Sequence, residues 1–391
     1  MNQETFIKRL CPQIELKYWR KRDLSIFTKG RRGFIVKIYQ LGLLYGDGIG
    51  PEVVESAVTI LRAASSRVGD TKFNIKELPV GWPAIHEYNS PLPEITKSEL
   101  EKMDGWIMGP HDSVSYPEAH KAFRNPSGEL RHHFGLYANI RPAKSIPGVL
   151  GVVNGADLVI FRENTEGFYT DRNMFAGTGE WNITQDIVIS AGLFTRKAIE
   201  RIAHAAFNMA MQRRKKVTIV HKSNVIKLGT GLFKDVCYEI AQQYPEVRVN
   251  DFHIDAMTAH LVRRISTFDI IVTENMFGDI LSDLSGELVG SLGLSPSINT
   301  NDHQAMAQAT HGAAPDIAGE NIANPAGMIL STAMLLRWLS SRHDDENLNE
   351  IAALMESAVY KTVETGATTP DLGGSKSTTS FTEAIVDRIK K

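Results

Sequence analysis

The chain has 391 residues, with 43 Lys and Arg against 45 Asp and Glu, two cysteines and 42% hydrophobic residues. This composition excludes a disordered chain, a collagen-like chain and a disulfide scaffold, and the length suggests about two domains. No segment approaches the roughly 20 apolar residues that span a bilayer. We therefore expect a soluble protein of a reducing compartment, the cytoplasm in the simplest case.

The charge is unevenly distributed along the chain. Residues 1–35 hold nine Lys and Arg and three acids, a balance of +6, which leaves −8 on the other 356 residues. A mildly acidic body gives no electrostatic reason to expect nucleic acid or a membrane surface as a partner. We interpret residues 1–35 as a basic N-terminal extension. It is open whether this extension is a transit peptide for an organellar matrix, an added arm or a start assigned too early, although Glu4, Glu15 and Asp23 are unusual in a transit peptide.

Regular secondary structure is predicted from residue 36 onward. Residues 36–46 form an apolar run typical of a buried strand, and a helical pattern with Pro51 in its first turn follows directly. Thr96 and Glu99 have the spacing of a capping box at a further helix start. Other predicted strands cover 105–108, 158–161, 217–220, 247–254 and 269–273, and helical patterns cover 194–214, 231–244 and the C-terminal end. This alternation predicts an α/β architecture with a central sheet flanked by helices.

The glycine-rich turn at residues 46–51, GDGIGP, resembles a phosphate-binding loop because it lies between a strand and a helix. A dinucleotide-binding G-x-G-x-x-G pattern would need glycine where Pro51 stands, and no acid follows about 20 residues later at a strand end. The spacing therefore favours a tight structural turn.

Arginine, tyrosine and lysine side chains lie near several predicted strands. Arg131, Arg141 and Arg162 would clamp a polycarboxylate if they converged, although isolated arginines are usually solvated. Tyr169 stands seven residues after Arg162, and Lys222 follows the strand predicted at 217–220. A lysine at the carboxyl end of a strand lies where α/β sheets bind ligands, and burial near other cations would adapt it to general-base use. Taken singly, each side chain is also typical of ordinary structure.

Acidic residues give the strongest local pattern. Asp279 and Asp283 are four residues apart and therefore share one face of a predicted helix. Their mutual repulsion would be reversed by a hard divalent cation, and Asp255, at the end of a predicted strand, would supply a third oxygen ligand. The alternative is that Asp279 only complements a helix N-terminus.

A Gly/Ala/Pro/Asn-rich loop covers residues 311–327 and precedes a long apolar helix. Loops of this length usually have a function, and this one is suited to wrap a nucleotide. Asp316 would accept hydrogen bonds from ribose hydroxyls and repel a 2′-phosphate, which predicts NAD rather than NADP.

Six segments together resemble the β-decarboxylating dehydrogenases, which act on isocitrate, 3-isopropylmalate, homoisocitrate, tartrate or D-malate. The resemblance extends from about Val36 to the end of the chain. The segments occur in the family's order and spacing: GDGIGPEVV, LYANIRP, FRENTEG, HKSNVIK, NMFGDILSDLSG and HGAAPDIAGENIANP. The resemblance implies NAD-dependent and Mg²⁺- or Mn²⁺-dependent oxidative decarboxylation of a 3-substituted malate.

The resemblance also implies a role for particular residues. Tyr169 and Lys222 match the catalytic pair, and the acids that match the metal ligands are Asp255, Asp279 and Asp283. The residues that match substrate contacts are Ser127, Arg131, Arg141, Arg162 and Asn224. The residues that match the cofactor loop are His311, Gly312, Ala313, Ala314, Asp316, Ile317 and Asn324. Because the family's equivalents of Lys222 and Asp255 reach into the neighbouring subunit's site, a homodimer is implied.

The fold implied by the resemblance has two domains around a central sheet and is not a Rossmann fold. Residues 37–136 and 290–391 would form the large, cofactor-side domain, and residues 137–289 the small domain with the dimer contacts. The active site would lie between them.

The segment HKAFRNPSGELR precedes the first arginine, where family members contact the substituent at C3 of the substrate. It matches neither the isopropylmalate nor the isocitrate pattern. Ser127 and Asn125 would contact a polar substituent and Arg124 a third carboxylate, whereas the cofactor loop is more similar to isopropylmalate enzymes, so we rank an alkyl-substituted malate first and isocitrate second. A rival of another class is a non-catalytic regulatory subunit, but such a subunit should have lost a catalytic or metal-binding residue, and all are present.

Overall fold

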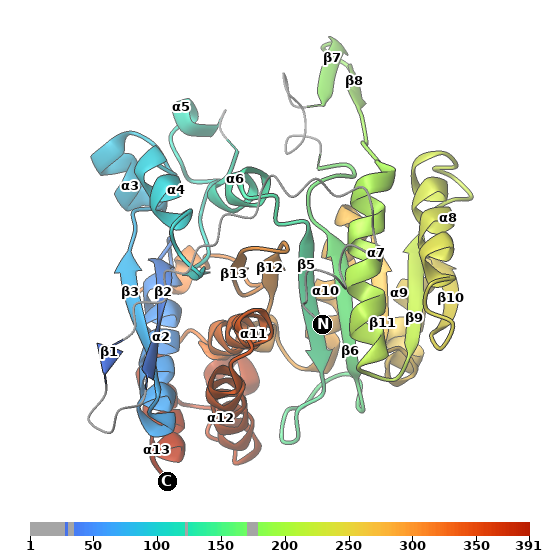
Figure 1. Cartoon of the computed structure of the whole chain (residues 1–391). Helices are drawn as coiled ribbons and strands as arrows, with labels where there is room; N and C mark the ends of the chain where they lie inside the picture. Colours follow the sequence, from blue (N-terminus) through green and yellow to red (C-terminus); the bar gives the residue numbers. More distant parts are fainter. Residues whose placement is uncertain (1–27, 30–34, 122–123, 170–178) are drawn as a thin grey trace, which may run out of the picture.

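The computed structural model describes residues 28–29, 35–121, 124–169 and 179–391. The predicted basic extension, 1–35, therefore lies outside the described residues except for residues 28–29 and 35. The described chain is an α/β fold built on an 11-stranded mixed sheet with helices on both faces (Figure 1). Within these residues, no helix is long and apolar enough to cross a membrane.

The strands of the large sheet run in the order β1-β2-β4-β13-β12-β5-β6-β11-β9-β10, with β3 also paired to β2. Strands β7 and β8 form a separate hairpin. The bounds of the strands are β1 (Thr28–Lys29), β2 (Ile35–Leu44), β3 (Thr71–Glu77), β4 (Gly105–Met108), β5 (Ala138–Lys144), β6 (Asp157–Glu163), β7 (Glu180–Thr184), β8 (Ile187–Ser190), β9 (Lys216–His221), β10 (Arg248–His253), β11 (Ile270–Thr273), β12 (Ile298–Thr300) and β13 (Ala305–Ala307).

The helices cover the two halves of this sheet. The α-helices are α2 (Gly50–Val68), α3 (Gly81–Tyr88), α4 (Glu94–Leu100), α5 (Glu118–Lys121), α6 (Pro126–His133), α7 (Arg196–Met211), α8 (Gly229–Ala241), α9 (Ile254–Arg264), α10 (Asn275–Val289), α11 (Ala326–His343), α12 (Glu346–Glu364) and α13 (Thr378–Lys390). Short 3₁₀ helices are η2 (Ile265–Thr267), η3 (Leu292–Leu294), η4 (Pro315–Ile317) and η5 (Pro370–Leu372).

The hydrophobic core follows the sheet order. Helices α2, α11, α12 and α13 pack with β2 and β4 into one cluster. On the other half, α7 and α8 pack on β6, β9 and β11, whereas α9 and α10 contribute to a second cluster with the same strands. Strand β5 is antiparallel to both of its neighbours, β6 and β12. It therefore joins the two halves of the sheet, whose parallel strands run in opposite directions.

The sequence-based prediction of an α/β fold with a sheet flanked by helices is confirmed, and the strand predicted at 105–108 coincides with β4. Two local predictions are wrong. Thr96 lies inside α4 and donates to the carbonyl oxygen of Pro79 at 2.7 Å, so it is not a capping-box residue. Asp255 does not end a strand, because β10 stops at His253 and Asp255 lies in the first turn of α9.

The turn at residues 46–51 is a packing turn, as its spacing favours. Gly48 has φ +59°, and a Cβ there would lie 2.0 Å from the carbonyl oxygen of Ala313. The amide of Ile49 donates to that same oxygen at 2.8 Å. Asp47 is buried and accepts hydrogen bonds from the amide of Trp82 at 2.7 Å and the hydroxyl of Tyr116 at 2.5 Å. The turn therefore connects β2 and α2 to the loop at 311–327.

Candidate active site

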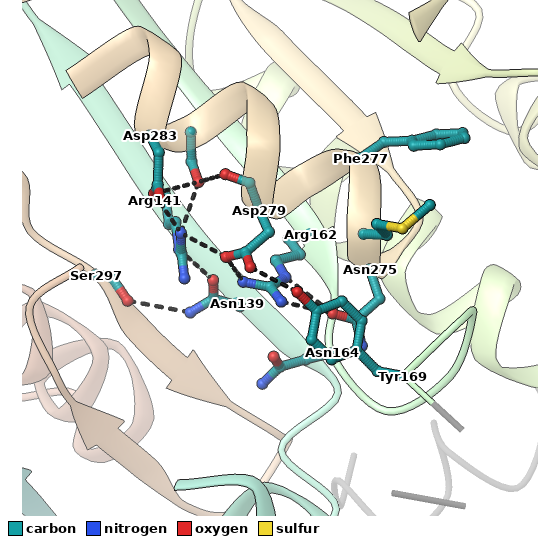
Figure 2. Close-up of polar contacts among 12 residues, drawn as sticks. Asn139, Arg141, Arg162, Asn164, Tyr169, Asn275, Phe277, Asp279, Asp283 and Ser297 are labelled. Atoms are coloured by element: carbon teal, nitrogen blue, oxygen red, sulfur yellow. Dashed lines mark hydrogen bonds and ion pairs between the residues drawn. The ribbon is translucent and has the colours of Figure 1, made fainter. Parts of the chain in front are cut away.

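Two arginines on adjacent strands face one acidic helix (Figure 2). Arg141 lies on β5 and Arg162 on β6, and α10 crosses both strands. Arg162 is 1% exposed, and its Nε and Nη2 donate to Oδ1 of Asn275 at 3.0 and 2.7 Å. Gly278 permits this approach, because a Cβ there would lie 2.5 Å from Cγ of Arg162. The glycine in NMFGD thus allows the helix to lie against a buried arginine.

The carboxylates of α10 neutralise both guanidinium groups. Arg162 Nη1 forms an ion pair with Asp279. Arg141 Nη1 lies 3.2 Å from Oδ1 of Asp279 and 3.2 Å from Oδ1 of Asp283, and it donates to Oγ of Ser282 at 2.6 Å. The predicted shared face of Asp279 and Asp283 is therefore present, and it contacts cations rather than solvent alone. Asp279 lies in the second turn of α10, whose N-terminus is capped by Glu274.

These contacts shift the titration of the two acids in opposite directions. Burial alone would raise the pKa of Asp279, but Arg162 and Arg141 outweigh it and lower that pKa to about 2. For Asp283, burial is the largest effect and raises the pKa, with only Arg141 close enough to oppose it strongly. Burial and the nearby Arg162 charge also lower the pKa of Arg141 to about 10. The two carboxylates on one helix face therefore differ in how strongly their surroundings favour the charged form.

Tyr169 joins the same cluster from the loop after β6. Its hydroxyl donates to Oδ2 of Asp279 at 2.7 Å, and the Arg162 guanidinium lies 5.3 Å from the centre of its ring. One carboxylate therefore contacts two arginines and a phenol.

Arg131 approaches from the other half of the sheet. It lies on α6 four residues after Ser127, and both side chains are buried and contact Gln308. Arg131 Nη2 donates to Oε1 of Gln308 at 3.3 Å, and Nε2 of Gln308 donates to Oγ of Ser127 at 2.7 Å. Arg131 also adds to the positive potential at Asp279. All three predicted arginines thus act on one carboxylate.

The two other polar residues predicted near a substituent make contacts within the protein. Asn125 caps α6, with its side-chain oxygen accepting from the amide of Gly128 at 2.7 Å. Arg124 Nη1 donates to Glu129 at 3.2 Å. Of the segment before Arg131, Ser127 is therefore the residue whose side chain joins the arginine cluster.

Lys222 and Asp255 lie apart from that cluster. Lys222 follows β9, as predicted, and its Nζ forms a hydrogen-bonded ion pair with Oδ1 of Asp255. Asn224 is exposed on the same loop. Among the described residues there is no group of three acids or other ligands able to hold a metal ion, so Asp255 does not join Asp279 and Asp283 within one chain.

The loop at 311–327 presents backbone and unsatisfied polar groups. His311 Nδ1 lies 3.1 Å from the carbonyl oxygen of Gly312, while His311 Nε2 is buried without a hydrogen-bond partner among the described residues. A Cβ at Gly312 would meet no atom within 4 Å. Ala314 adopts a left-handed conformation before η4, where Asp316 is exposed and Ile317 half-buried. These features fit a nucleotide, which would supply a partner for His311 and space-filling contact at Gly312.

The rest of this loop is anchored to the fold. Asn324 Nδ2 donates to Asp371 at 3.0 Å, and its side-chain oxygen accepts from the amide of Ala326 at 3.0 Å. The amide of Gly319 donates to Glu52 on α2 at 2.6 Å. The Ala313 carbonyl receives the amide of Ile49, as described above. Asn324 therefore positions the loop, whereas Asp316 lies free for a ligand.

Several buried amides that were not predicted from the sequence organise the site. Asn139 accepts from Arg141 Nε at 2.6 Å and donates to Ser297 at 3.0 Å and to Asn299 at 2.9 Å. Asn164 donates to the same oxygen of Asn299 at 3.0 Å. These asparagines are buried, and Asn139 and Asn164 lie inside the LYANIRP and FRENTEG segments. A buried amide beside an arginine in an otherwise apolar strand was the available signal.

The arrangement of these side chains indicates the class of protein. Arginines and carboxylates meet around a tyrosine, and a loop suited to a nucleotide follows β13; this combination is typical of an enzyme that binds a polycarboxylate and a nucleotide.

Comparison with known proteins identifies the family. The profile of the isocitrate/isopropylmalate dehydrogenase family matches residues 40–388. The chain is 41% identical to the 3-isopropylmalate dehydrogenase of Archaeoglobus fulgidus over 345 residues, which are 88% of this chain and 97% of the relative. It is 40% identical to the isocitrate/homoisocitrate dehydrogenase of Thermus thermophilus over 353 residues, which are 90% and 99%. The crystal structure of isocitrate dehydrogenase from Methylococcus capsulatus has a TM-score of 0.80 and 36% identity, covering 90% of this chain and 100% of that one.

The chain belongs to the isocitrate/isopropylmalate dehydrogenase family. It is therefore an oxidoreductase of a family that carries out oxidative decarboxylation of small hydroxy acids with a nucleotide cofactor and a divalent metal ion. The predicted family and its fold are confirmed.

Proposed function

We propose that the protein is an NAD-dependent, Mg²⁺- or Mn²⁺-dependent dehydrogenase that oxidatively decarboxylates a 3-substituted malate. The observation that supports this most directly is the carboxylate of Asp279, which contacts Arg141, Arg162 and Tyr169 together. An anion-binding pair of guanidiniums, a metal-binding acid and a proton donor are thereby within reach of one small substrate.

The donor set fits a hard divalent cation. Carboxylate oxygens are the ligands that Mg²⁺ and Mn²⁺ prefer, and Asp279 and Asp283 offer two carboxylates from one helix face. When bound, the cation polarises the substrate's hydroxyl and carbonyl oxygens, and NAD⁺ accepts the hydride. Once the two acids are engaged by a cation, Arg141 and Arg162 can bind substrate carboxylates bidentately.

The protein's own groups would bind the substrate and move its protons. Arg131, Arg141 and Arg162 orient the carboxylates. Lys222, directly or through water and Asp255, takes the proton from the C2 hydroxyl as the hydride leaves. After CO₂ is lost, Tyr169 returns a proton to C3.

We further propose that the enzyme is a homodimer with shared active sites. Lys222 and Asp255 contact each other and not the arginine cluster, which supports their action in the neighbouring subunit's site. The β7–β8 hairpin stands away from the body of the chain (Figure 1) and exposes apolar side chains on it: Trp181, Ile183, Ile187, Val188 and Ile189. Such a surface requires a cover in water. Residues 137–289 would form this small, dimer-forming domain, and 37–136 with 290–391 the large one.

Two substituents at C3 remain as candidates. An alkyl group, as in 3-isopropylmalate, is favoured by the relatives that carry that name. A polar group, as in isocitrate, is favoured by Ser127. Arg131 can only donate, so Oε1 of Gln308 faces Arg131 and Nε2 of Gln308 donates to Ser127. The hydroxyl hydrogen of Ser127 is then directed only at the sulfur of Met108, 4.0 Å away, and can donate to a polar substituent.

A substrate panel tests the proposal. Purified protein with Mn²⁺ is incubated with isocitrate, 3-isopropylmalate, homoisocitrate, D-malate and tartrate, each with NAD⁺ and with NADP⁺, and reduced cofactor is followed by absorbance. We expect NADH with at least one 3-substituted malate. No turnover across the panel would refute the proposal and favour a regulatory subunit instead.

A further inference from the structure

His221 is the buried residue that ends β9, immediately before Lys222. The side chain is 2% exposed. Its Nδ1 lies 3.1 Å from the backbone nitrogen of Ser223, and its Nε2 lies 2.8 Å from Oδ2 of Asp251 on β10. A backbone N–H can only donate, so Nδ1 is the acceptor and the ring proton lies on Nε2, which donates to Asp251. The contacts therefore define one neutral tautomer.

The partners of the ring are themselves held in place. Tyr238 on α8 donates its hydroxyl to Oδ1 of Asp251 at 2.5 Å. Asp251 thus accepts one hydrogen bond on each carboxylate oxygen, from the His221 ring and from Tyr238. The position of the ring is therefore fixed through β10 and α8 together. Burial lowers the pKa of His221 and prevails over Asp251, which favours the charged form. The neutral ring required by the Ser223 contact is therefore the stable form near neutral pH.

This ring closes a short loop around Lys222, from the residue before it to the residue after it. The other backbone groups of Lys222 are engaged as well. Its amide donates to Oγ1 of Thr230 at 3.2 Å, and its carbonyl oxygen accepts from the amides of Val225 at 3.0 Å and Ile226 at 2.9 Å. The backbone of Lys222 is thus fixed on both sides, while its side chain extends to the ion pair with Asp255.

We propose that His221, held by Asp251 and Tyr238, is a positioning residue that fixes the backbone of Lys222 through the Nδ1 contact to Ser223. The inference rests on the proposed function, in which Lys222 moves the hydroxyl proton. Because proton transfer and orientation demand a narrow geometry, a misplacement of about 1 Å is enough to lower the rate about 100-fold.

Two amide substitutions separate the two ring contacts. His221→Asn places an oxygen near Nδ1, where it accepts from the Ser223 amide as asparagine commonly does two residues on, but it loses Asp251. His221→Gln places an amide near Nε2, which retains a donor to Asp251 but loses the Ser223 contact. His204→Gln is the matched control, because His204 lies on α7, which packs on the same half of the sheet, and its Nδ1 lies 3.0 Å from the Tyr244 hydroxyl.

We expect His221→Gln to lower kcat about 100-fold with little change in KM for NAD⁺, and His221→Asn to restore kcat to within about 10-fold of wild type. The control should match wild type. Hydrogen exchange of the segment 222–228, followed by mass spectrometry, should accelerate in His221→Gln and stay slow in His221→Asn.

Each outcome decides between the two proposals. The positioning role would be overturned if the wild type turns over substrate and kcat falls equally in both variants, or does not fall in His221→Gln. Either result would leave the proposed function intact. If wild-type protein turns over no substrate, the proposed function fails. Unchanged hydrogen exchange at 222–228 in His221→Gln would then overturn the role of His221 in fixing the Lys222 backbone, independently of activity.

Discussion

Replacing Asp279 by asparagine removes the one anion that serves both buried arginines. Arg162 is 1% exposed and would retain only neutral acceptors such as Oδ1 of Asn275, while Arg141 lies close enough to repel it. Breaking a buried ion pair costs about 3–5 kcal/mol, but Asp279 is 34% exposed and solvent screens part of the interaction. We expect the free energy of unfolding to fall by about 2 kcal/mol.

Asp283→Asn is the matched control on the same helix face. Asp283 is 50% exposed and has one cationic contact, Arg141 at 3.2 Å, which retains Asp279 in the variant. We expect a cost below about 1 kcal/mol. The two variants are isosteric changes four residues apart, so the difference between them reports the charge environment and not the shape of the side chain.

Urea unfolding measures the stability of both variants, and thermal unfolding with and without Mn²⁺ measures metal binding. Both variants should lose most of the Mn²⁺-induced rise in Tm, because each removes a proposed metal ligand. Equal stability costs in the two variants would refute the assignment of Asp279 as the shared counter-ion. A full Mn²⁺ effect in Asp279→Asn would refute its role as a ligand.

Three further outcomes are expected. Lys222→Ala should abolish turnover while NAD⁺ still binds, measured by fluorescence titration; retained activity would reject its role as base. Burial raises the pKa of Glu274 from 4.5 to about 7, so the folded state binds more protons between these values and stability falls as pH rises through 7. This loss is about 1.4 kcal/mol between pH 6 and 8, and Glu274→Gln should abolish it in urea unfolding at the two pH values. For Asp316, NAD⁺ should have the lower KM in the wild type, and Asp316→Arg should shift the preference towards NADP⁺; a wild-type preference for NADP⁺ would contradict this.

Patterns confined to one segment were predictable from the sequence. Apolar runs predicted the strands of the sheet, and helical periodicity predicted the helices that cover it. Both predictions succeed because a buried strand or helix face requires apolar residues at a fixed local spacing. The shared face of Asp279 and Asp283 follows from helical geometry alone. The failed glycine pattern at residues 46–51 correctly favoured a packing turn, since Gly48 leaves no room for a Cβ beside Ala313.

Contacts between distant segments were not predictable in the same way. Thr96 has the spacing of a capping residue, but the carbonyl of Pro79 takes its hydroxyl. The residues around Asp255 are compatible both with the end of a strand and with the start of a helix. The local pattern therefore did not predict that Asp255 lies in the first turn of α9. Gln308 joins Ser127 and Arg131 across 177 residues or more, and no local pattern marks it as part of a site.

The pairing of cations with acids explains how such a site is stable before substrate arrives. Two guanidiniums buried on β5 and β6 would destabilise the fold if they faced each other alone, because burial and then the charge of Arg162 lower the pKa of Arg141. The carboxylates of α10 supply the missing charge from a helix that Gly278 allows to approach closely. The same acids are the proposed metal ligands, so a bound cation would engage the carboxylates while the substrate's carboxylates would engage the arginines. The residues that stabilise the fold and those proposed to bind ligand are therefore the same, and charge balance would be maintained in both states.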